Sequence, residues 1–543
     1  MVTLLEFTAP SIDYARLAPF LIVIGAACLG VLIEAFVSRQ WRHEVQTGLA
    51  VLALLGAGAA IVLNWGEPYG LVDPVPASDL VAYATGSVMV DHWSQVFWLA
   101  LVVFGLLALL LFSERVAYGG QTAFTSAAAA IPGSRLEAES TVARKHHSEV
   151  FPLALFSLAG MMLFVASEDL LVMFVALEIL SFPLYVLAAL ARHRRLASQE
   201  AALKYFLLGA AASGIFLFGM ALVFAYAGTF DLETLSLTVT GGGESQALLL
   251  AGLGLMAVGL LFKVGAVPFH SWVPDVYQGS PTPVTAFMAV CVKLTAVAGM
   301  LRLFYAGFGG ALWTWRPLFI VVAILTMVIG AVVAIVQTDV KRLLAYSSVT
   351  HAGFILVGVT GALVFRGTDP TTGMLDLFGF GSVGSIMFYL VAYGLATLGC
   401  FAAVTLVQTS GREATSLDAW SGLGRAYPWF GAVMVICLLS LAGIPLTAGF
   451  VGKFAVFTAA WRGGLWWLVL IAVVLSIVAV YIYFRVIVAM FFRPRVDDVE
   501  VKRPGPATVV VMLVAVVGTL ALGLVPGPLV DVLSQLSTFL TEL

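Results

Sequence analysis

Charged side chains are scarce in this sequence. Of its 543 residues only 27 are Lys or Arg and 30 are Asp or Glu, while 61% are hydrophobic, and the mean hydropathy is +1.04. Soluble globular proteins do not carry this much apolar surface, so the composition predicts a polytopic membrane protein in a lipid bilayer. The net charge of −3 says little about partners, and no nucleic-acid partner is expected.

Cysteines and cofactor motifs are equally few. The four cysteines, Cys28, Cys291, Cys400 and Cys437, lie in separate apolar segments without CxxC spacing, unlike iron–sulfur or zinc ligands. No Gly-rich phosphate loop stands between a strand and a helix, and no region is rich in strand-forming residues. The sequence therefore predicts an all-α protein with no cofactor or metal on this chain. The N-terminus lacks a basic region followed by a cleavage site, so the first apolar segment is expected to be retained.

Long apolar segments are what the sequence has in abundance. A membrane-spanning helix needs about 20 such residues. About fourteen segments qualify, at about 14–37, 44–64, 88–112, 149–166, 168–191, 198–227, 246–268, 281–306, 313–336, 341–364, 382–408, 427–458, 463–492 and 505–525. The last apolar piece, 527–541, is too short to span and is predicted to lie along a surface.

The distribution of basic residues predicts the orientation of these segments. If the N-terminus lies outside, 17 of the 27 Lys and Arg fall in cytoplasmic loops, five fall in outer loops and five lie in the membrane. Positive charges accumulate on the cytoplasmic side of membrane proteins, so fourteen spans with both termini outside fit the pattern. The polar insertion 113–147 is then cytoplasmic, and the acidic stretch 65–86 is outside.

Two of the segments are interrupted. Lys263 to Lys293 reads KVGAVPFHSWVPDVYQGSPTPVTAFMAVCVK, and Pro268 deprives the carbonyl of Val264 of its helical partner. A broken helix beside an ionisable residue is how transporters build ion sites in the bilayer, although Pro268 alone can also mark a simple helix end. A second interrupted segment, LAGIPLTAGFVGKF, contains Lys453. The breaks lie five spans apart, which predicts two inverted five-helix repeats, spans 4–8 and 9–13, with spans 7 and 12 broken.

These patterns divide the chain into five parts. They are three N-terminal spans (1–112), the cytoplasmic insertion (113–147), a first repeat (148–308), a second repeat (309–492) and a last helix with an amphipathic tail (493–543).

A set of ionisable residues lies inside the predicted spans. Glu178 is ten residues past Glu168, about 15 Å into the membrane, where a carboxylate is expected to pair with a lysine. Lys204 is the nearest candidate in sequence, but it could also extend to the cytoplasmic surface. The whole set is predicted to form a lateral proton relay; it comprises Glu178, Lys204, Lys263, His270, Lys293, His351 and Lys453. The two histidines could equally be hydrogen-bonded core residues.

Five sequence motifs resemble one known family. AVPFHSWVPDVYQGSPTPVTAFMA, EDLLVMFVALEILSFPLYVL, QEAALKYFLLGAAASG, QTDVKRLLAYSSVTHAGF and LAGIPLTAGFVGKF resemble the subunit N family of bacterial respiratory complex I, the counterpart of mitochondrial NADH dehydrogenase subunit 2. The likeness runs from about 149 to 490. VYQGSPTPVTAF and Lys453 resemble subunit N rather than the related subunits L and M or Mrp antiporter subunits. The first three spans are less distinctive, and insertion 113–147 departs from the family.

The resemblance implies a non-redox, proton-translocating subunit of NADH:quinone oxidoreductase in the bacterial plasma membrane. It implies that Glu178 and Lys204 form a coupled pair, that Lys263 and Lys293 are central relay residues, and that Lys453 lies on the exit side. The implied neighbours are the antiporter-like subunit M on one side and small membrane subunits such as K and J on the other. Quinone, NADH, FMN and iron–sulfur clusters are expected on partner subunits.

Two other functions remain open from the sequence. The chain could belong to a multi-subunit cation/proton antiporter driven by an ion gradient. It could also be a structural spacer whose buried charges only hold helices together.

Overall fold

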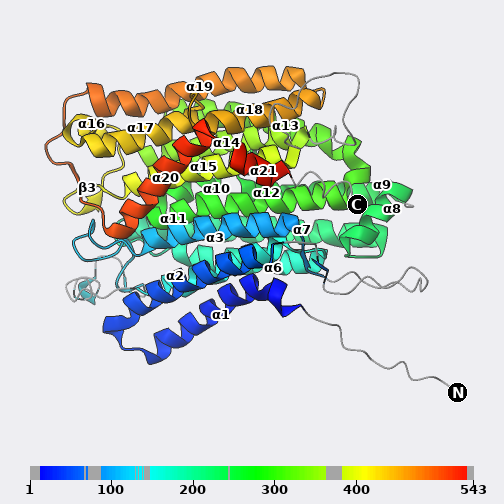
Figure 1. The fold of residues 1–543 in the computed structure, drawn as a ribbon, viewed down its shortest axis with the longest axis horizontal. Helices are drawn as coiled ribbons and strands as arrows, with labels where there is room; N and C mark the ends of the chain where they lie inside the picture. The colour runs from blue at the N-terminus through cyan, green and yellow to red at the C-terminus, as the bar shows by residue number, and fades with distance from the viewer. Residues whose placement is uncertain are drawn as a thin grey trace.

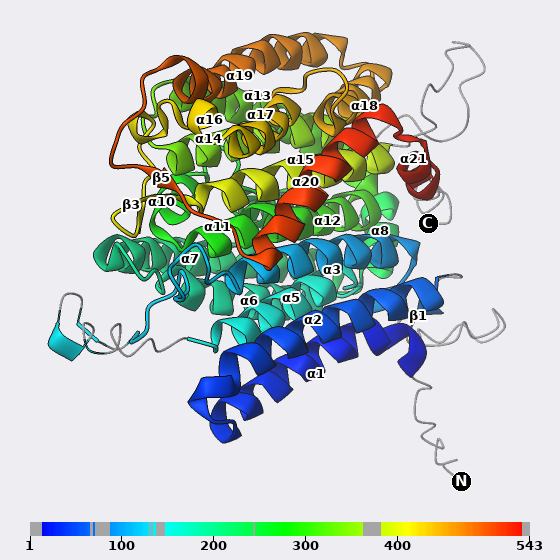
Figure 2. The same ribbon diagram turned by 60° about the vertical axis from the view of Figure 1, so that its left-hand side comes forward.

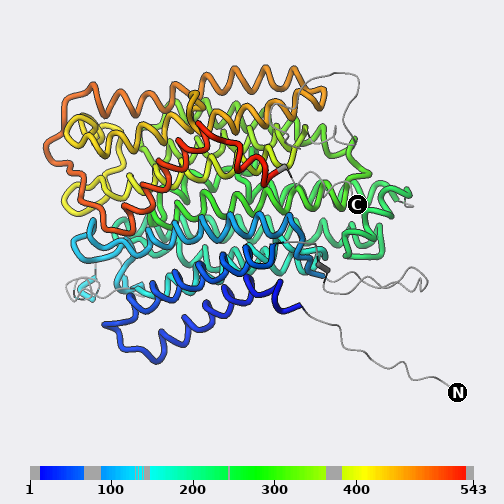
Figure 3. Tube along the Cα trace, in the orientation of Figure 1, coloured from blue at the N-terminus to red at the C-terminus, as the bar shows by residue number. Residues whose placement is uncertain are grey.

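The computed structural model describes residues 13–65, 69–70, 87–128, 147–242, 245–361 and 382–534, together with a few residues between 130 and 139. Its helices pack side by side in one bundle with their axes roughly aligned (Figure 1), and the chain path is followed most easily in Figure 3. In chain order the elements are α1 (Tyr14–Phe36), α2 (Arg39–Leu63), β1 (Tyr69–Gly70), β2 (Met89–Val90), α3 (His92–Phe112), α5 (Val150–Val165), α6 (Leu170–Ala188), α7 (Arg195–Ala227), α8 (Leu232–Gly241), α9 (Gln246–Val264), α10 (Trp272–Gly279), α11 (Thr282–Phe287), η1 (Met288–Val292), α12 (Lys293–Leu301), η2 (Arg302–Gly307), η3 (Gly309–Ala311), α13 (Leu312–Ile335), α14 (Val340–Thr360), α15 (Ser382–Val404), β3 (Val407–Thr409), β4 (Arg412–Glu413), η5 (Asp418–Trp420), α16 (Leu423–Ala426), α17 (Pro428–Ala442), α18 (Ala448–Arg462), α19 (Trp466–Phe492), β5 (Glu500–Val501), α20 (Pro506–Leu524) and α21 (Gly527–Ser534).

The two ends of the bundle can be told apart by small elements. A three-stranded antiparallel sheet in the order β4-β3-β5 lies at one end, which we call the sheet end. The short helix α8 lies at the opposite end, the α8 end (Figure 2). The start of α1 and the helix α21 are both at the α8 end, as an even number of crossings requires.

The prediction of a polytopic, all-α membrane protein is confirmed. Among the described residues, twelve helical spans are long and apolar enough to cross a membrane, or up to thirteen if the bent pair Asp418–Ala426 and Pro428–Ala442 counts as one span. The apolar helix α5, with 16 residues, is shorter than this. Every predicted segment therefore has a helical counterpart, but the number fourteen stays a prediction.

Both predicted helix breaks are present. Helix α9 ends at Val264 and the chain becomes helical again at Trp272, while α17 ends at Ala442 and α18 begins at Ala448. The two ends have the same geometry. Gly265 (φ +80°) and Gly443 (φ +81°) each adopt a left-handed conformation, in which the N–H of the glycine and the N–H of the next residue bond back to the helix. This is a Schellman motif, for which glycine is the favoured residue because it lacks a Cβ atom. The first helix therefore ends at Val264 and is capped by Gly265, three residues before Pro268, and the prediction that Pro268 causes the break was wrong.

The eighth predicted span is the most deeply enclosed helix of the bundle. It runs from α11 to η2, and it changes to π-helix twice, at Met288–Val292 and at Arg302–Gly307. Its apolar window is entirely buried inside the protein. Insertions of this kind are frequently found at functional sites, and the first one directly precedes Lys293.

The packing agrees with the predicted inverted repeats without testing them. Helix α5 pairs with α6 and α7 with α9 and α10, just as α13 pairs with α14 and α15 with α17 and α18. Helix α5 starts at the sheet end and α13 starts beside η3 at the α8 end, where η3 contacts α8. The repeat layout and the five-part division of the chain remain predictions.

Arg302 is a buried charge at the α8 end of the core. Its side chain is fully buried and donates to Asp91 Oδ2 at 2.8 Å and to Oδ1 at 3.0 Å. It also pairs with Glu168 and donates to Ser94 at 3.2 Å. Arg302 is one of the five Lys and Arg residues predicted to lie in outer loops, whereas it lies inside the protein and joins α3, η2 and the segment before α6.

Glu114 fixes the last long helix to the first part of the chain. This buried carboxylate accepts the N–H of Ala117 at 2.9 Å and the N–H of Gly505, at the start of α20, at 2.9 Å. It also accepts the hydroxyl of Thr508. A helix N-terminus carries unpaired N–H groups and a partial positive charge, so a carboxylate is stabilised there.

Three predictions concern residues outside those described. They are the acidic stretch 65–86, apart from its edges, much of the insertion 113–147, and the end of the surface segment 527–541. The described part of segment 527–541, α21, is helical.

Candidate functional site

Lys263 is the second-last residue of α9, directly before the break, and it contacts α6. Its Nζ donates to the Ser181 hydroxyl at 2.7 Å and lies 5.7 Å from the ring centres of Tyr185 and Tyr205, where an ammonium is attracted by the aromatic face. A cavity of about 10 Å³ borders Lys263 and reaches Thr295 in α12. That volume is near the minimum for one water molecule.

Lys293 follows the π-helical segment η1 and contacts α14. Its Nζ donates to the Ser348 carbonyl at 2.5 Å and to the Ser348 hydroxyl at 2.7 Å. Tyr393 of α15 donates to the same hydroxyl at 2.8 Å, and its ring centre lies 5.1 Å from the ammonium. The amine is therefore enclosed by α12, α14 and α15.

His351 lies in α14, one helical turn after Ser348. Its Nδ1 is 2.5 Å from the Tyr389 hydroxyl and its Nε2 is 2.9 Å from the Tyr483 hydroxyl. Tyr483 is in turn 2.5 Å from the hydroxyl of Ser347. All four side chains are buried, so both ring nitrogens are fully engaged by groups of α15 and α19.

Lys453 lies just after the second break, in α18. Its Nζ donates to the Ala442 carbonyl, the last residue of α17, at 2.8 Å and to the Ser476 hydroxyl of α19 at 3.0 Å. The ammonium also lies 5.0 Å from the ring centre of Phe354. The break in span 12 thus supplies a carbonyl to its own lysine.

Lys263, Lys293 and Lys453 share one property. Each is buried, and each is held by a serine hydroxyl; within the part of the chain that the structure describes, none has a carboxylate within 4.0 Å. A hydroxyl can accept from an ammonium or donate to a neutral amine. The three sites therefore suit either protonation state of the lysine.

Glu178 and Lys204 are not paired in this structure. Glu178 is half-buried on α6, and its Oε1 has no hydrogen-bond partner among the described residues; it lies one helical turn before Ser181, the partner of Lys263. Lys204 instead pairs with Glu200 at 2.7 Å and with Asp275 at 2.9 Å. The predicted contact between Glu178 and Lys204 is therefore absent, because α7 directs the lysine toward α10.

Asp275 is the centre of a charged cluster, although it is not one of the predicted relay residues. Besides Lys204 it accepts from Arg342 at 2.8 Å, and Arg342 also donates to Gln278 at 3.2 Å. The cluster borders a cavity of about 250 Å³ that is also lined by Arg194. It brings the broken helix α10 into contact with α7 and α14.

His270 lies apart from the buried lysines. It is half-buried in the break after α9, where its Nδ1 has no hydrogen-bond partner among the described residues and its ring packs edge-on against Tyr346. This places it between α10 and α14, near the Asp275 cluster.

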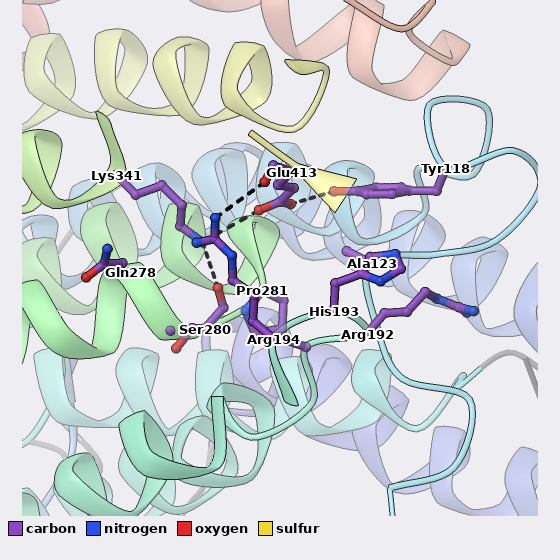
Figure 4. A pocket seen from close by; sticks show the side chains of 12 residues that line it. Tyr118, Ala123, Arg192, His193, Arg194, Gln278, Ser280, Pro281, Lys341 and Glu413 are labelled. Atoms are coloured by element: carbon purple, nitrogen blue, oxygen red, sulfur yellow. Dashed lines mark hydrogen bonds and ion pairs between the residues drawn. The ribbon is translucent and has the colours of Figure 1, made fainter. Parts of the chain in front are cut away.

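A second pocket at the sheet end was also missed from the sequence (Figure 4). Lys341, buried at the start of α14, donates to the Ser280 carbonyl at 2.8 Å and lies 3.8 Å from Glu413. Glu413 accepts from Thr282 at 2.6 Å and from Tyr118 at 2.9 Å. Burial and the Glu413 carboxylate raise the pKa of Tyr118 well above its ordinary value, so its hydroxyl stays a donor. Glu413 could not be found from the sequence because its partners are distant along the chain and it lies in a short polar strand, β4, between two predicted spans.

The set has no metal-binding character. Among the described residues, no group of three or more His, Cys, Asp or Glu side chains is placed to hold a metal ion. The predicted relay residues and their partners instead offer amines, imidazoles and hydroxyls, which are groups that can transfer protons.

Comparison with known proteins identifies the family. The family model described as "NADH:quinone oxidoreductase/Mrp antiporter, TM" matches residues 167–479. NADH-quinone oxidoreductase subunit N of Cutibacterium acnes is 46% identical over 99% of this chain and 97% of its own length. Subunit N of a Nocardioides species is 48% identical over 98% of this chain and 100% of its own length. The chain belongs to the NADH-quinone oxidoreductase subunit N family.

Solved structures agree with membership of the subunit N family. A chain of respiratory complex I from Thermus thermophilus with bound Aureothin is 32% identical, with a TM-score of 0.73 over 95% of this chain and 99% of that one. A chain of the Mrp complex from a Dietzia species has a TM-score of 0.78 over 98% of both chains, at 21% identity. At that identity the second likeness shows a shared fold. The resemblance to the subunit N family read from the motifs is therefore confirmed.

Proposed function

We propose that this member of the subunit N family is a proton-translocating, non-redox membrane subunit of an NADH:quinone oxidoreductase. The observation that carries the proposal is the set of three buried lysines, each held by a serine hydroxyl and, among the described residues, none with a carboxylate within 4.0 Å. A permanent charge in such a place is expensive. An amine that exchanges a proton with its surroundings avoids holding that charge permanently.

The relay residues have different roles in this proposal. Lys204 and the Asp275 cluster receive protons at the sheet end, where the 250 Å³ cavity lies. Glu178 acts electrostatically on its neighbour Lys263, and Lys293 and His351 transfer the proton to Lys453. His270 lies beside the Asp275 cluster, where protons enter, and is not part of the series of buried lysines.

The complex supplies the driving reaction. We propose that quinone reduction, NADH oxidation, FMN and the iron–sulfur clusters belong to partner subunits. The neighbours in the membrane are subunit M on one side and small subunits such as K and J on the other.

The proposed orientation places the sheet end in the cytoplasm of a bacterial cell and both termini outside. It rests on the excess of basic residues in the loops of that end. Single cysteines introduced in 113–147 and in 65–86 should react with an impermeant reagent from opposite sides of the plasma membrane. Labelling of both positions from one side would contradict the orientation.

The Lys293→Arg substitution tests the function. Arginine keeps the charge but does not lose its proton at any working pH, so a relay lysine cannot be replaced by it, whereas a structural cation can. We expect assembled Lys293→Arg complexes to take up protons into reconstituted vesicles far more slowly than wild type. The exposed Lys502, which pairs with Glu500 on the surface, provides the matched control Lys502→Arg, which should pump normally. Equal pumping by both assembled variants would favour the structural spacer.

A further inference from the structure

The surroundings of His351 restrict how a proton can reach it. An imidazole has two nitrogens, and here Tyr389 occupies Nδ1 at 2.5 Å while Tyr483 occupies Nε2 at 2.9 Å. The histidine and both tyrosines are buried, with exposed fractions of 2%, 1% and 0%. A water molecule or a lysine could approach either nitrogen only by displacing a tyrosine.

The hydrogen bonds of this group can run in two directions. A neutral imidazole donates from one nitrogen and accepts at the other, and a phenol can do both. If Tyr389 donates to His351, then His351 donates to Tyr483 and Tyr483 donates to Ser347. In the other tautomer every bond is reversed. Both arrangements satisfy all four side chains, so the same atoms fit the group before and after a proton has passed.

The group lies between the two lysine sites. Ser347 is the neighbour of Ser348, which binds Lys293. Tyr389 is one helical turn from Tyr393, which donates to that same Ser348. Toward Lys453, Tyr389 also packs against Gly452, the neighbour of that lysine, where an added Cβ would lie 3.0 Å from Tyr389 Cα. Tyr483 is two turns from Ser476, the partner of Lys453, and residues at this spacing share a helix face.

We propose that the hydroxyls of Tyr389 and Tyr483 carry the proton to and from His351, so that the two tyrosines are members of the relay. This inference rests on the proposed function. In one transfer a proton arrives at the Ser347 oxygen from the Lys293 side, the former Ser347 proton moves to the Tyr483 oxygen, and the former Tyr483 proton moves to Nε2. The Nδ1 proton moves to the Tyr389 oxygen, and the former Tyr389 proton leaves toward Lys453. One proton enters, one leaves, and His351 changes tautomer without a lasting charge.

Tyrosine-to-phenylalanine substitutions test the inference, since they keep the ring and remove only the hydroxyl. Tyr305 provides a matched control, because its hydroxyl donates to the Val359 carbonyl at 2.7 Å, away from the relay. We expect proton uptake per assembled complex to fall at least about 100-fold in Tyr389→Phe and Tyr483→Phe, the low end of what a positioned proton-transfer group contributes. Tyr305→Phe should stay near wild type. The amount of assembled complex is measured by immunoblot of this chain.

A His351→Gln variant separates the possible failures. If His351→Gln is slow while both tyrosine variants pump like Tyr305→Phe, the tyrosines are not relay members and the proposed function stands. If His351→Gln pumps at the wild-type rate, the inference is overturned, and the Lys293→Arg comparison decides the proposed function by itself.

A fluorinated tyrosine covers the case in which a phenylalanine variant does not assemble. Site-specific 3,5-difluorotyrosine at 483 keeps the ring and the hydroxyl and makes the hydroxyl more acidic. A relay hydroxyl predicts a changed rate of proton uptake and a changed solvent deuterium isotope effect. Wild-type values of both would overturn the inference.

Discussion

Replacing Arg302 by methionine should destabilise the protein more than any exposed charge replacement. Arg302 is fully buried and makes hydrogen bonds to Asp91, Glu168 and Ser94. Arg302→Met leaves two buried carboxylates close together without their cation. Removing one partner of a buried ion pair typically costs about 3–5 kcal/mol. Arg302→Lys keeps one charge but cannot serve both carboxylates, so we expect it to lose about 1.5–3 kcal/mol, the value of one hydrogen bond to a charged group.

The measurement is the thermal unfolding midpoint of the detergent-solubilised complex. Arg493→Met is the control, because Arg493 pairs with Asp418 at the surface, where the side chains are 48% and 90% exposed and a pair is worth about 0–1 kcal/mol. The expected order of midpoints is wild type and Arg493→Met, then Arg302→Lys, then Arg302→Met. Adding Asp91→Asn and Glu168→Gln to Arg302→Met removes the unpaired charges and should raise its midpoint. If Arg302→Met has the same unfolding midpoint as Arg493→Met, the buried ion pairs of Arg302 do not contribute the expected stability.

Two further predictions concern the relay. Glu178→Asp should keep part of the proton uptake and Glu178→Gln much less, because only a carboxylate can carry the charge that acts on Lys263; equal uptake by both assembled variants would make Glu178 a structural residue. Gly443→Ala should lower the free energy of unfolding by about 1–2 kcal/mol, because alanine is strained in the left-handed conformation. It should also impair pumping, because the new Cβ would lie 2.8 Å from Lys453 Cδ. The control is Gly228→Ala, at φ +71° with open space around the new Cβ, which should have the same stability cost and pump normally.

Much of the fold follows from the sequence because the bilayer leaves few alternatives. Each long apolar segment has to satisfy its backbone internally, so it forms a helix, and the segments found by length have helical counterparts. The breaks were located correctly and explained wrongly. Proline is conspicuous, but Gly265 and Gly443 set the helix ends through backbone geometry that depends on a glycine at one position.

The candidate site was predictable in its members and not in their contacts. Burial of Lys263, Lys293 and Lys453 follows from their position in apolar segments. The partners of Lys204 do not, since Asp275 is far away in sequence and only the rotation of α7 decides whether the lysine faces it or Glu178. Tyrosines in apolar segments are common, so nothing in the sequence distinguishes Tyr389 and Tyr483 from ordinary core residues.

The contact between Glu114 and the start of α20 has a consequence for biosynthesis. Its donors at Gly505 and Thr508 lie 391 and 394 residues later in the chain, and at about 5–20 residues per second the ribosome needs about 20–80 s to reach them. Throughout that interval the carboxylate has one of its three donors, the N–H of Ala117, and it has to remain hydrated. The contact that fixes α20 to the first part of the chain therefore forms only after the last long helix has been synthesised.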